Sequence, residues 1–264
     1  EPWIAALKSG RWKFEGRENQ LEFGLKAIEP AKASDVLGQL VGGKTLPRDG
    51  SGPWIELIGS AGGSAELRRL FDLVTGGTLK GAVAVRALAA LTDAARLRDA
   101  KPAAEPAALG ALFDSSEAAI RRAAVQLAGA WKAAALVSRL TPLAAGEDRA
   151  VVFAALRDIG GNTVVAALTK LVAADSPATP EVRREAVVVL AALNANAALP
   201  AVIATLRATT GEAEAQALWR ALLGIRGFSA KLAAELSKVE LPAAVARAGL
   251  RPAREGTQHQ ALVP

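Results

Sequence analysis

The sequence contains no cysteine, no methionine and no tyrosine, and aromatic residues make up only 4% of its 264 positions. Without cysteine, the chain cannot form a disulfide, a thiolate nucleophile, a cysteine-ligated zinc site or a covalent attachment of c-type haem. A Ser-His-Asp triad would depend on the single histidine, His259. We expect His259 to be exposed in a C-terminal tail, with a metal or haem ligand in a linker as the alternative. The sequence therefore predicts no catalytic, cofactor-binding or metal-ligating residue, and we do not expect this chain to be an enzyme.

An initiator methionine is also absent, since the chain begins Glu1-Pro2-Trp3. We therefore expect a processed or excised part of a larger protein. We find no secretory signal peptide and no apolar run of about 18 or more residues, so no insertion into a membrane is expected. These absences determine neither the cellular compartment nor the oligomeric state.

Alanine, leucine and other apolar residues dominate what is present. Apolar residues account for 51% of the chain and charged residues for 22%. Alanine and leucine favour helices, whereas a sheet protein would carry more β-branched and aromatic residues. The net charge of +6 and the pI of about 9.9 suit an acidic partner, a nucleic acid or an anionic surface, and they also suit a generic basic surface with no such partner.

Four segments between residues 116 and 238 repeat one pattern of two amphipathic helices joined by a turn. Within each segment, apolar residues recur at intervals of three and four positions. One leucine of the first helix recurs at spacings of 29, 34 and 32 residues, at Leu127, Leu156, Leu190 and Leu222. Such a period is typical of stacked helix pairs, so we predict an all-α, right-handed α-solenoid of about seven to eight antiparallel pairs.

The turns and helix starts of these segments follow a common chemistry. Acidic residues stand near the start of each first helix, where the helix dipole is positive, at Glu117, Glu147, Glu181 and Glu212. Glycine or asparagine at each turn is expected to supply the left-handed residue that ends the first helix. These turns are expected at residues 129–132, 160–162, 194–196 and 226–227.

The same pattern continues less regularly towards the N-terminus. We expect helix pairs at residues 18–29 with 32–42, 53–60 with 64–75, and 79–98 with 104–113. The organisation predicted is irregular helix pairs in residues 1–113, regular repeats in residues 114–250, and a tail or linker in residues 251–264. Within this scheme, residues 241–249 are expected to form the start of a last helix.

Two segments resemble the bacterial HEAT repeat, in which an acidic residue or proline precedes Val/Ile-Arg and a small residue. They are EAAIRRAAV from Glu117 and PEVRREAVV from Pro180. The unit at residue 147 departs from this pattern, because Ala150-Val151-Val152 stands where Val/Ile-Arg is expected. The resemblance implies stacked helix pairs that present a surface to other proteins.

Two further segments resemble the helical region of large bacterial proteins that join a dehydrogenase-like propeller, HEAT repeats and a c-type cytochrome module. They are GSGPWIELIGSAGGSAELRRL from Gly50 and LPAAVARAGL from Leu241. The resemblance implies a parent oxidoreductase whose haem module would follow Pro264, and a periplasmic or cell-envelope location. No haem is implied in this chain, which has no cysteine; without that parentage, a cytoplasmic location is expected.

Residues 38–45 match the spacing of a phosphate-binding loop, with Gly38, Gly43, Lys44 and Thr45 in the required places. That motif needs a strand before it and a helix after it, whereas the preceding residues read as helix and residues 46–50 as loop. Nucleotide binding is therefore not predicted. We interpret the second glycine-rich segment, residues 59–63, as a turn between helices.

Tryptophans and arginines offer two candidates for contacts between repeats. Trp131 and Trp219 are expected to pack between helix pairs, with exposed stacking on a base or a partner as the alternative. The pairs Arg121-Arg122 and Arg183-Arg184 stand at matching positions, and we expect them to bridge to acids of an adjacent repeat.

The second helices carry a candidate partner-binding stripe of basic residues at Arg139, Lys170, Arg207 and Lys238. A solvated charged face without a partner is the alternative interpretation. The leading hypothesis is a non-catalytic scaffold that binds proteins or flanking modules of the same polypeptide. The second is nucleic-acid binding along the basic stripe, and the third is a structural part of a haem-containing dehydrogenase whose redox centres lie outside this chain.

Overall fold

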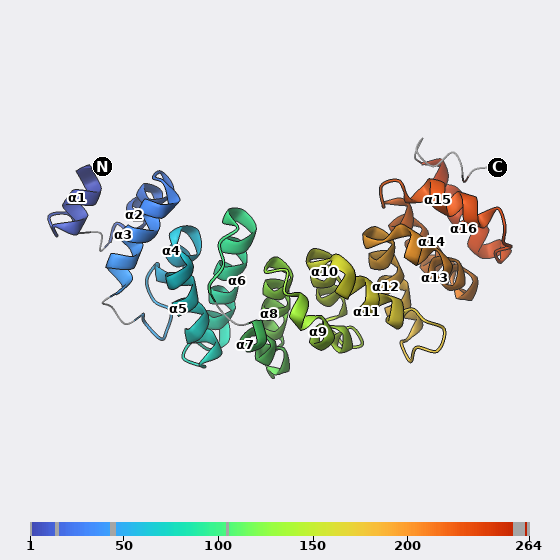
Figure 1. Ribbon diagram of the computed structural model, residues 1–264, viewed down its shortest axis with the longest axis horizontal. Coiled ribbons are helices and arrows are strands. Elements are labelled where there is room, and N and C mark those ends of the chain that lie inside the picture. The colour runs from blue at the N-terminus through green and yellow to red at the C-terminus, as the bar shows by residue number, and fades with distance from the viewer. Residues whose placement is uncertain (1, 14–15, 43–45, 104–105, 256–261, 263–264) are drawn as a thin grey trace. The chain divides into compact units, whose positions relative to one another are not determined.

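The protein is all-helical in the part that its computed structural model describes, residues 2–13, 16–42, 46–103, 106–255 and 262 (Figure 1). These residues form sixteen α-helices and two short 3-10 helices, with no strand among them. The predicted all-α class is therefore confirmed. The chain divides by its internal contacts into two compact units, residues 1–136 and residues 137–264.

Unit 1 contains eight α-helices and two 3-10 turns. Its α-helices are α1 (Pro2–Lys8), α2 (Glu18–Lys26), α3 (Pro30–Gly42), α4 (Trp54–Ala61), α5 (Ser64–Thr75), α6 (Gly81–Arg98), α7 (Pro106–Gly110) and α8 (Ala118–Ala130). The 3-10 turns are η1 (Ala111–Asp114) and η2 (Ala134–Leu136). Helices α2 to α6 each pack against the next helix or the next but one, and α6 packs along α8. The expected helix pairs in residues 18–113 agree with these bounds to within a few residues, whereas α1 was not predicted.

Unit 2 contains the remaining eight α-helices. They are α9 (Val137–Leu143), α10 (Arg149–Ile159), α11 (Gly161–Leu171), α12 (Pro180–Leu193), α13 (Ala195–Ala208), α14 (Glu212–Leu223), α15 (Phe228–Leu236) and α16 (Ala243–Arg254). Helices α10, α12, α14 and α16 pack in succession, while α9 contacts α11 and α13 contacts α15. Each helix thus lies against neighbours that are close in the chain.

The cores of both units are built from leucine and alanine. The four periodic leucines are completely buried: Leu127, Leu156, Leu190 and Leu222 have no exposed surface. Small residues let helices approach closely, as at Gly59 of α4, where an added Cβ would lie 2.8 Å from the Cβ of Ala90 on α6. The hydrophobic periodicity therefore identified the buried faces correctly.

Two of the four turns use the expected glycine and two do not. Gly160 and Gly227 have positive φ angles of 61° and 73°. After α8, the residue with positive φ is Lys132, at 52°, while Gly129 lies buried inside the helix. Asn194 is extended, with a φ of −149°, and its side chain accepts a hydrogen bond from the Ala197 N–H at the start of α13. The left-handed role assigned to asparagine there was wrong, because its amide oxygen instead satisfies a free N–H of the next helix.

The last described helix runs further than expected. Helix α16 continues through Arg254, and Pro252 and Ala253 in its final turn are buried. These residues are therefore part of the packed fold. His259 lies outside the described residues. Within the described ranges, no helix is both long and apolar enough to cross a membrane.

Candidate interaction grooves

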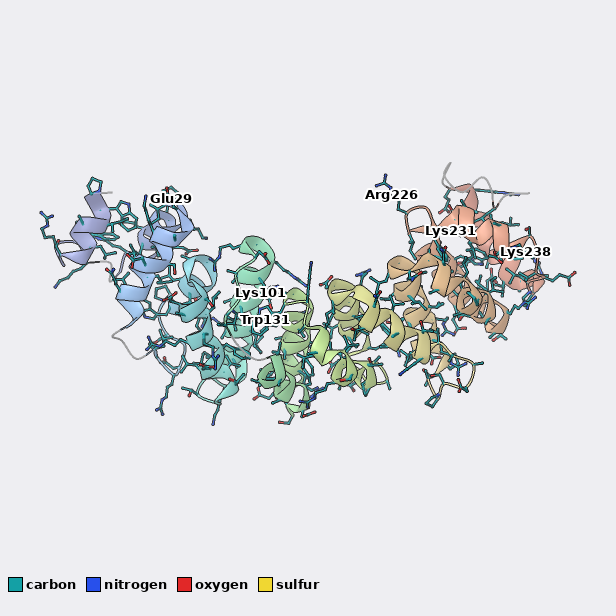
Figure 2. All side chains as sticks on the ribbon, viewed as in Figure 1. Glu29, Lys101, Trp131, Arg226, Lys231 and Lys238 are labelled. Atoms are coloured by element: carbon teal, nitrogen blue, oxygen red, sulfur yellow. The ribbon has the colours of Figure 1, made fainter. Side chains whose placement is uncertain are left out.

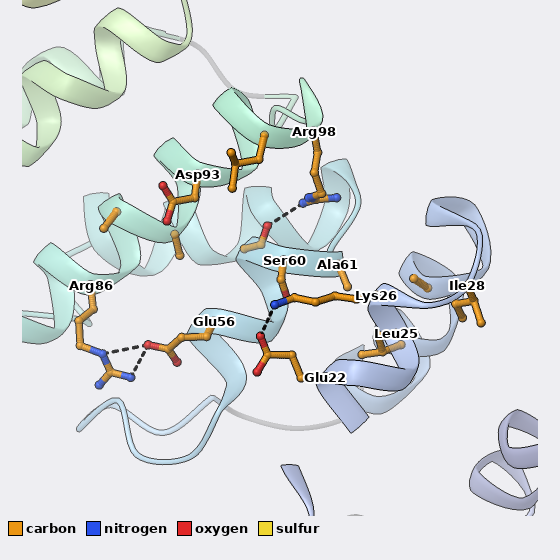
Figure 3. A pocket seen from close by; sticks show the side chains of 15 residues that line it. Glu22, Leu25, Lys26, Ile28, Glu56, Ser60, Ala61, Arg86, Asp93 and Arg98 are labelled. Carbon is orange, nitrogen blue, oxygen red and sulfur yellow. Dashed lines mark hydrogen bonds and ion pairs between the residues drawn. The ribbon is translucent and has the colours of Figure 1, made fainter. Parts of the chain in front are cut away.

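Helices α2, α4 and α6 enclose a groove of about 580 Å³ in unit 1, here called the α2–α4–α6 groove (Figure 3). Apolar side chains form its floor, among them Leu25, Ala61 and Ala90. Leu97 lines the groove and is 81% exposed, which is unusual for a leucine on a folded helix. An exposed apolar side chain beside an apolar floor is typical of a surface that another molecule covers.

Ion pairs neutralise most of the charge around this groove. Arg86 of α6 donates to Oε1 of Glu56 on α4 through Nη2 at 2.7 Å and through Nε at 3.1 Å (Figure 3). Lys26 and Glu22 pair within α2, with 2.6 Å between Nζ and Oε1. Both pairs are about half exposed, so each stabilises the fold by at most about 1 kcal/mol. Their main effect is to fix the charged rim in one geometry.

Arg98 closes one end of the groove by capping α4. Its Nη2 donates to the carbonyl oxygens of Gly59 and Gly62, at 2.8 and 3.0 Å. Burial lowers the pKa of the Arg98 guanidinium, which nevertheless stays charged at neutral pH. Its Nε is buried and has no hydrogen-bond partner among the described residues. Arg98 therefore supports the groove wall and is not available to a ligand.

Helices α10, α12 and α14 enclose a similar groove of about 510 Å³ in unit 2, the α10–α12–α14 groove. Its floor includes Phe153, Val189 and Leu218, all buried. Two ion pairs cross it from one helix to the next. Arg149 Nε lies 2.7 Å from Oε1 of Glu185, and Arg184 Nη2 lies 3.4 Å from Oε1 of Glu214.

The two Arg-Arg pairs were expected to bridge to acids of an adjacent repeat, and Arg184 does so. Arg184 makes that bridge to Glu214 on the next first helix. Arg121 donates to the Ser115 carbonyl at 2.9 Å and takes part in a further interaction, and Arg183 donates to the Ser176 carbonyl. Both of these arginines hold the loop that precedes their own helix. A carbonyl a few residues back is within easy reach of an arginine at the start of a helix.

A third groove, of about 650 Å³, lies between α9, α11 and residues 172–179 of unit 2. We call it the α9–α11 groove. Lys170 lies on its rim and Pro142, Ala166 and Leu171 are among the apolar residues along it. One residue of the predicted basic stripe therefore borders an apolar groove.

All four stripe residues are exposed, and all lie in unit 2 on α9, α11 and α13 or just after α15. Arg207 Nε donates to the Glu240 carbonyl at 3.1 Å. Lys238, labelled in Figure 2, pairs through Nζ with Glu235 Oε1 at 2.9 Å. Arg139 is also engaged in an interaction. Lys170 is the member whose ammonium has no hydrogen-bond or ion-pair partner within the described part of the chain.

The tryptophans pack as the sequence predicts. Trp219 is 4% exposed, and its Nε1 donates to the Val245 carbonyl at 2.9 Å. The ring of Trp131 meets the ring of Phe71 edge-on, with 5.1 Å between centroids, and Lys101 donates to the Trp131 carbonyl at 3.3 Å (Figure 2). Trp219 is therefore buried, and Trp131 is half-buried with its ring against Phe71.

The glycine-rich segments match the expected helical context only in part, because residues 59–61 of the second belong to α4 and not to the turn. Gly38 lies inside α3, whereas Gly43, Lys44 and Thr45 of the phosphate-loop pattern lie outside the described residues. Gly62 and Gly63 form the turn between α4 and α5. Among the described residues, no group of three or more His, Asp or Glu side chains could hold a metal ion.

The sequence patterns predicted a bridge from Arg184 but missed the ion pairs of Arg86 with Glu56 and of Arg149 with Glu185. Glu56 and Arg86 are 30 residues apart, as are Arg184 and Glu214, while Arg149 and Glu185 are 36 apart. These ion pairs could have been predicted from an acidic residue and an arginine that lie one repeat length apart at exposed helix positions.

No family model, curated protein or solved structure matches this chain. The relation to HEAT repeats is therefore a prediction that depends on the residues of the repeats themselves.

Proposed function

We propose that the chain is a HEAT-type, right-handed α-solenoid that acts as a non-catalytic scaffold and binds other proteins or modules of its own polypeptide. The order of contacts supports this architecture, because helices pack against near neighbours in the chain throughout each unit. The recurring buried leucines and the arginine bridge from Arg184 to Glu214 also support a repeated unit. A helix pair of this kind buries its apolar face only by stacking on its neighbours.

The grooves are the observation that carries the scaffold function. Each unit presents an apolar floor between its first helices, bordered by three basic and three acidic side chains, most of which are paired with one another. An apolar centre with a polar rim is the usual anatomy of a protein-docking surface. The paired rim leaves little net charge to attract a polyanion, which favours a protein partner.

The dehydrogenase and cytochrome resemblance suggests one setting for such a scaffold. There, the helical repeats would hold a redox module and an electron acceptor in place, while the redox centres belong to other segments. This parentage is the second part of the proposal and is independent of the groove argument. The sequence of the complete gene tests it, since a Cys-x-x-Cys-His motif downstream is expected and its absence would contradict it.

Site-specific photo-crosslinking in cells that produce the protein tests the scaffold function. A photoreactive amino acid is placed at Leu97 and at Ala217, which are exposed and line the first two grooves. Matched positions are Lys80 and Arg226, which are exposed and lie outside every groove described above. We expect a discrete protein adduct at the groove positions and none at the matched positions.

Two results would contradict the proposal. Equal labelling at all four positions would mean that no groove is a docking surface. Turnover of a substrate by the purified chain, lost on substitution of one particular residue, would mean that the chain is an enzyme.

A further inference from the structure

The α9–α11 groove differs from the other two grooves in its charge. Of the residues that line it, Lys170 is the only ionisable one. Its ammonium is exposed and unpaired among the described residues. Each of the other two grooves is lined by three basic and three acidic residues, and their Arg86, Arg149 and Arg184 are each paired with a glutamate. This groove therefore presents one uncompensated positive charge beside apolar surface.

The rest of the lining is apolar or carries hydroxyl groups. Apolar side chains come from α9, α11 and the following loop, among them Pro142, Ala145, Ala166, Leu171 and Pro177. Hydroxyl groups come from Ser138, Thr141 and Thr163. Exposed hydroxyls and aliphatic surface together suit a peptide, because the hydroxyls can bond its backbone while the aliphatic groups cover its side chains.

Hydrogen bonds hold the loop wall of the groove in place. Arg183 of α12 donates to the Ser176 carbonyl, and the Ala178 N–H donates to the Ser176 hydroxyl at 3.3 Å. The Thr179 hydroxyl accepts from the Val182 N–H at 3.4 Å, which joins the loop to the start of α12. A wall formed before the ligand arrives needs less ordering on binding, and this favours affinity.

We propose that the α9–α11 groove binds an acidic, aliphatic-rich peptide segment of a partner protein, with a carboxylate of the peptide paired to Lys170. This proposal rests on the scaffold function and names the chemistry of one of its partners. A nucleic acid fits less well, because binding of single strands relies on several cations and on aromatic stacking, and this lining has one cation and no aromatic ring. Negative charge and aliphatic surface in one short segment match what the groove offers.

Fluorescence anisotropy with the full chain and short labelled peptides tests the inference. The probe is a pool of synthetic peptides composed of leucine, valine, alanine, aspartate and glutamate. Two comparison pools keep one property each: serine replaces the aliphatic residues in the first, and lysine replaces the acids in the second. We expect saturable binding of the acidic aliphatic pool alone.

Two substitutions separate a groove from general electrostatic attraction. Lys170→Glu should weaken binding by about tenfold or more, because a charge-assisted hydrogen bond is lost and a like charge is introduced. Arg226→Glu makes the same change in net charge at an exposed site outside the groove and should change binding by less than about twofold. Ala166→Arg adds a positive charge, but its side chain fills the groove, so it should abolish binding. Ala192→Arg adds the same charge at an exposed position of α12 outside the groove and should leave binding intact.

Four results would overturn the inference. These are no saturable binding of the acidic aliphatic pool, equal binding of the acidic serine pool, equal effects of Lys170→Glu and Arg226→Glu, or stronger binding by Ala166→Arg. Competition by anionic lipid vesicles or single-stranded DNA that depends on Lys170 would reassign the groove to those ligands and reject the peptide. Crosslinking at Leu97 and Ala217 concerns other grooves, so the scaffold function can stand while this inference fails.

Discussion

Gly249 of α16 lies directly against the indole ring of Trp219 on α14. A Cβ added to Gly249 would lie 2.6 Å from the Cε2 atom of Trp219, closer than side chains can approach. The same approach lets the Trp219 Nε1 donate to the Val245 carbonyl at 2.9 Å. The absence of a side chain at residue 249 thus allows α16 to pack on α14 and satisfies the buried indole N–H.

Gly249→Ala is expected to destabilise the protein. Alanine gains about 1 kcal/mol over glycine in a helix, but overpacking against a buried ring costs about 1–3 kcal/mol, so the clash should prevail. Urea denaturation followed by circular dichroism measures the change. Gly146→Ala is the matched control in the same unit, because its nearest neighbour would be at 3.6 Å and its φ is not positive. Equal stability of the two variants would show that Trp219 can move aside.

The ion pair between Arg149 and Glu185 is expected to couple the two helices weakly. Both side chains are more than a third exposed, so water screens the interaction between them. A double-mutant cycle with alanine at both positions should therefore give a coupling free energy below about 1 kcal/mol. This coupling should fall as salt is added. Urea denaturation of the four proteins at low and high salt measures it. A Lys80 and Glu185 cycle should give no coupling. A large coupling unaffected by salt would contradict the exposed geometry.

Glu181, in the first turn of α12, is expected to titrate below the ordinary range of glutamate. Its own backbone N–H donates to the carboxylate and lowers its pKa, and the Thr179 hydroxyl and the Arg184 charge lower the pKa further. A carboxyl group whose pKa is lower in the folded state than in the unfolded state stabilises the fold at pH values above the pKa of the unfolded state. That contribution is lost as the pH falls through the folded pKa.

Thr179→Val tests this cause. Removal of the hydroxyl should raise the pKa of Glu181, which NMR titration of its carboxyl carbon measures. The same change removes the N-cap of α12 and should cost about 1 kcal/mol of stability. Thr169→Val is the control, since among the described residues that hydroxyl bonds to the Val165 carbonyl of its own helix and not to a carboxylate. An unchanged titration in Thr179→Val would exclude the hydroxyl as a contributor.

Nucleic-acid binding along the basic stripe makes a separate prediction. If Arg139, Lys170, Arg207 and Lys238 contact phosphates, the logarithm of the association constant for duplex DNA should fall linearly with the logarithm of salt concentration. Reversal of Arg139 and Lys170 to glutamate should then reduce both the affinity and the slope. Electrophoretic mobility shifts over a salt series measure both. Reversal of Arg226 and Lys231, which are exposed elsewhere in unit 2, provides the control (Figure 2). Equal effects of the two double reversals would count against a stripe.

Local features of the chain were largely predictable. The spacing of Leu127, Leu156 and Leu190 identified buried helix faces, and α12 begins at Pro180, where the repeat-like segment PEVRREAVV begins. The turn at residues 194–196 was located correctly, but the role of Asn194 was not. An asparagine near a helix boundary can end one helix or cap the next, and the spacing of apolar residues does not distinguish these roles.

Candidate sites were much less predictable. The stripe residues were chosen because they recur on second helices, but recurrence does not show which cation is already paired. Arg207 and Lys238 are engaged by Glu240 and Glu235, whereas Lys170 is left beside an apolar groove. A groove is formed by helices from several parts of the chain, so its existence depends on how those helices pack.

The sequence by itself determined the helical class, the faces that are buried and most of the helix boundaries, because these depend on side chains a few residues apart. Only the tertiary structure decided which arginines are consumed in bridges, where apolar grooves lie open and how closely helices approach at Gly59 and Gly249. Those properties arise between residues about 30 apart or more, where a local pattern carries no information about distance.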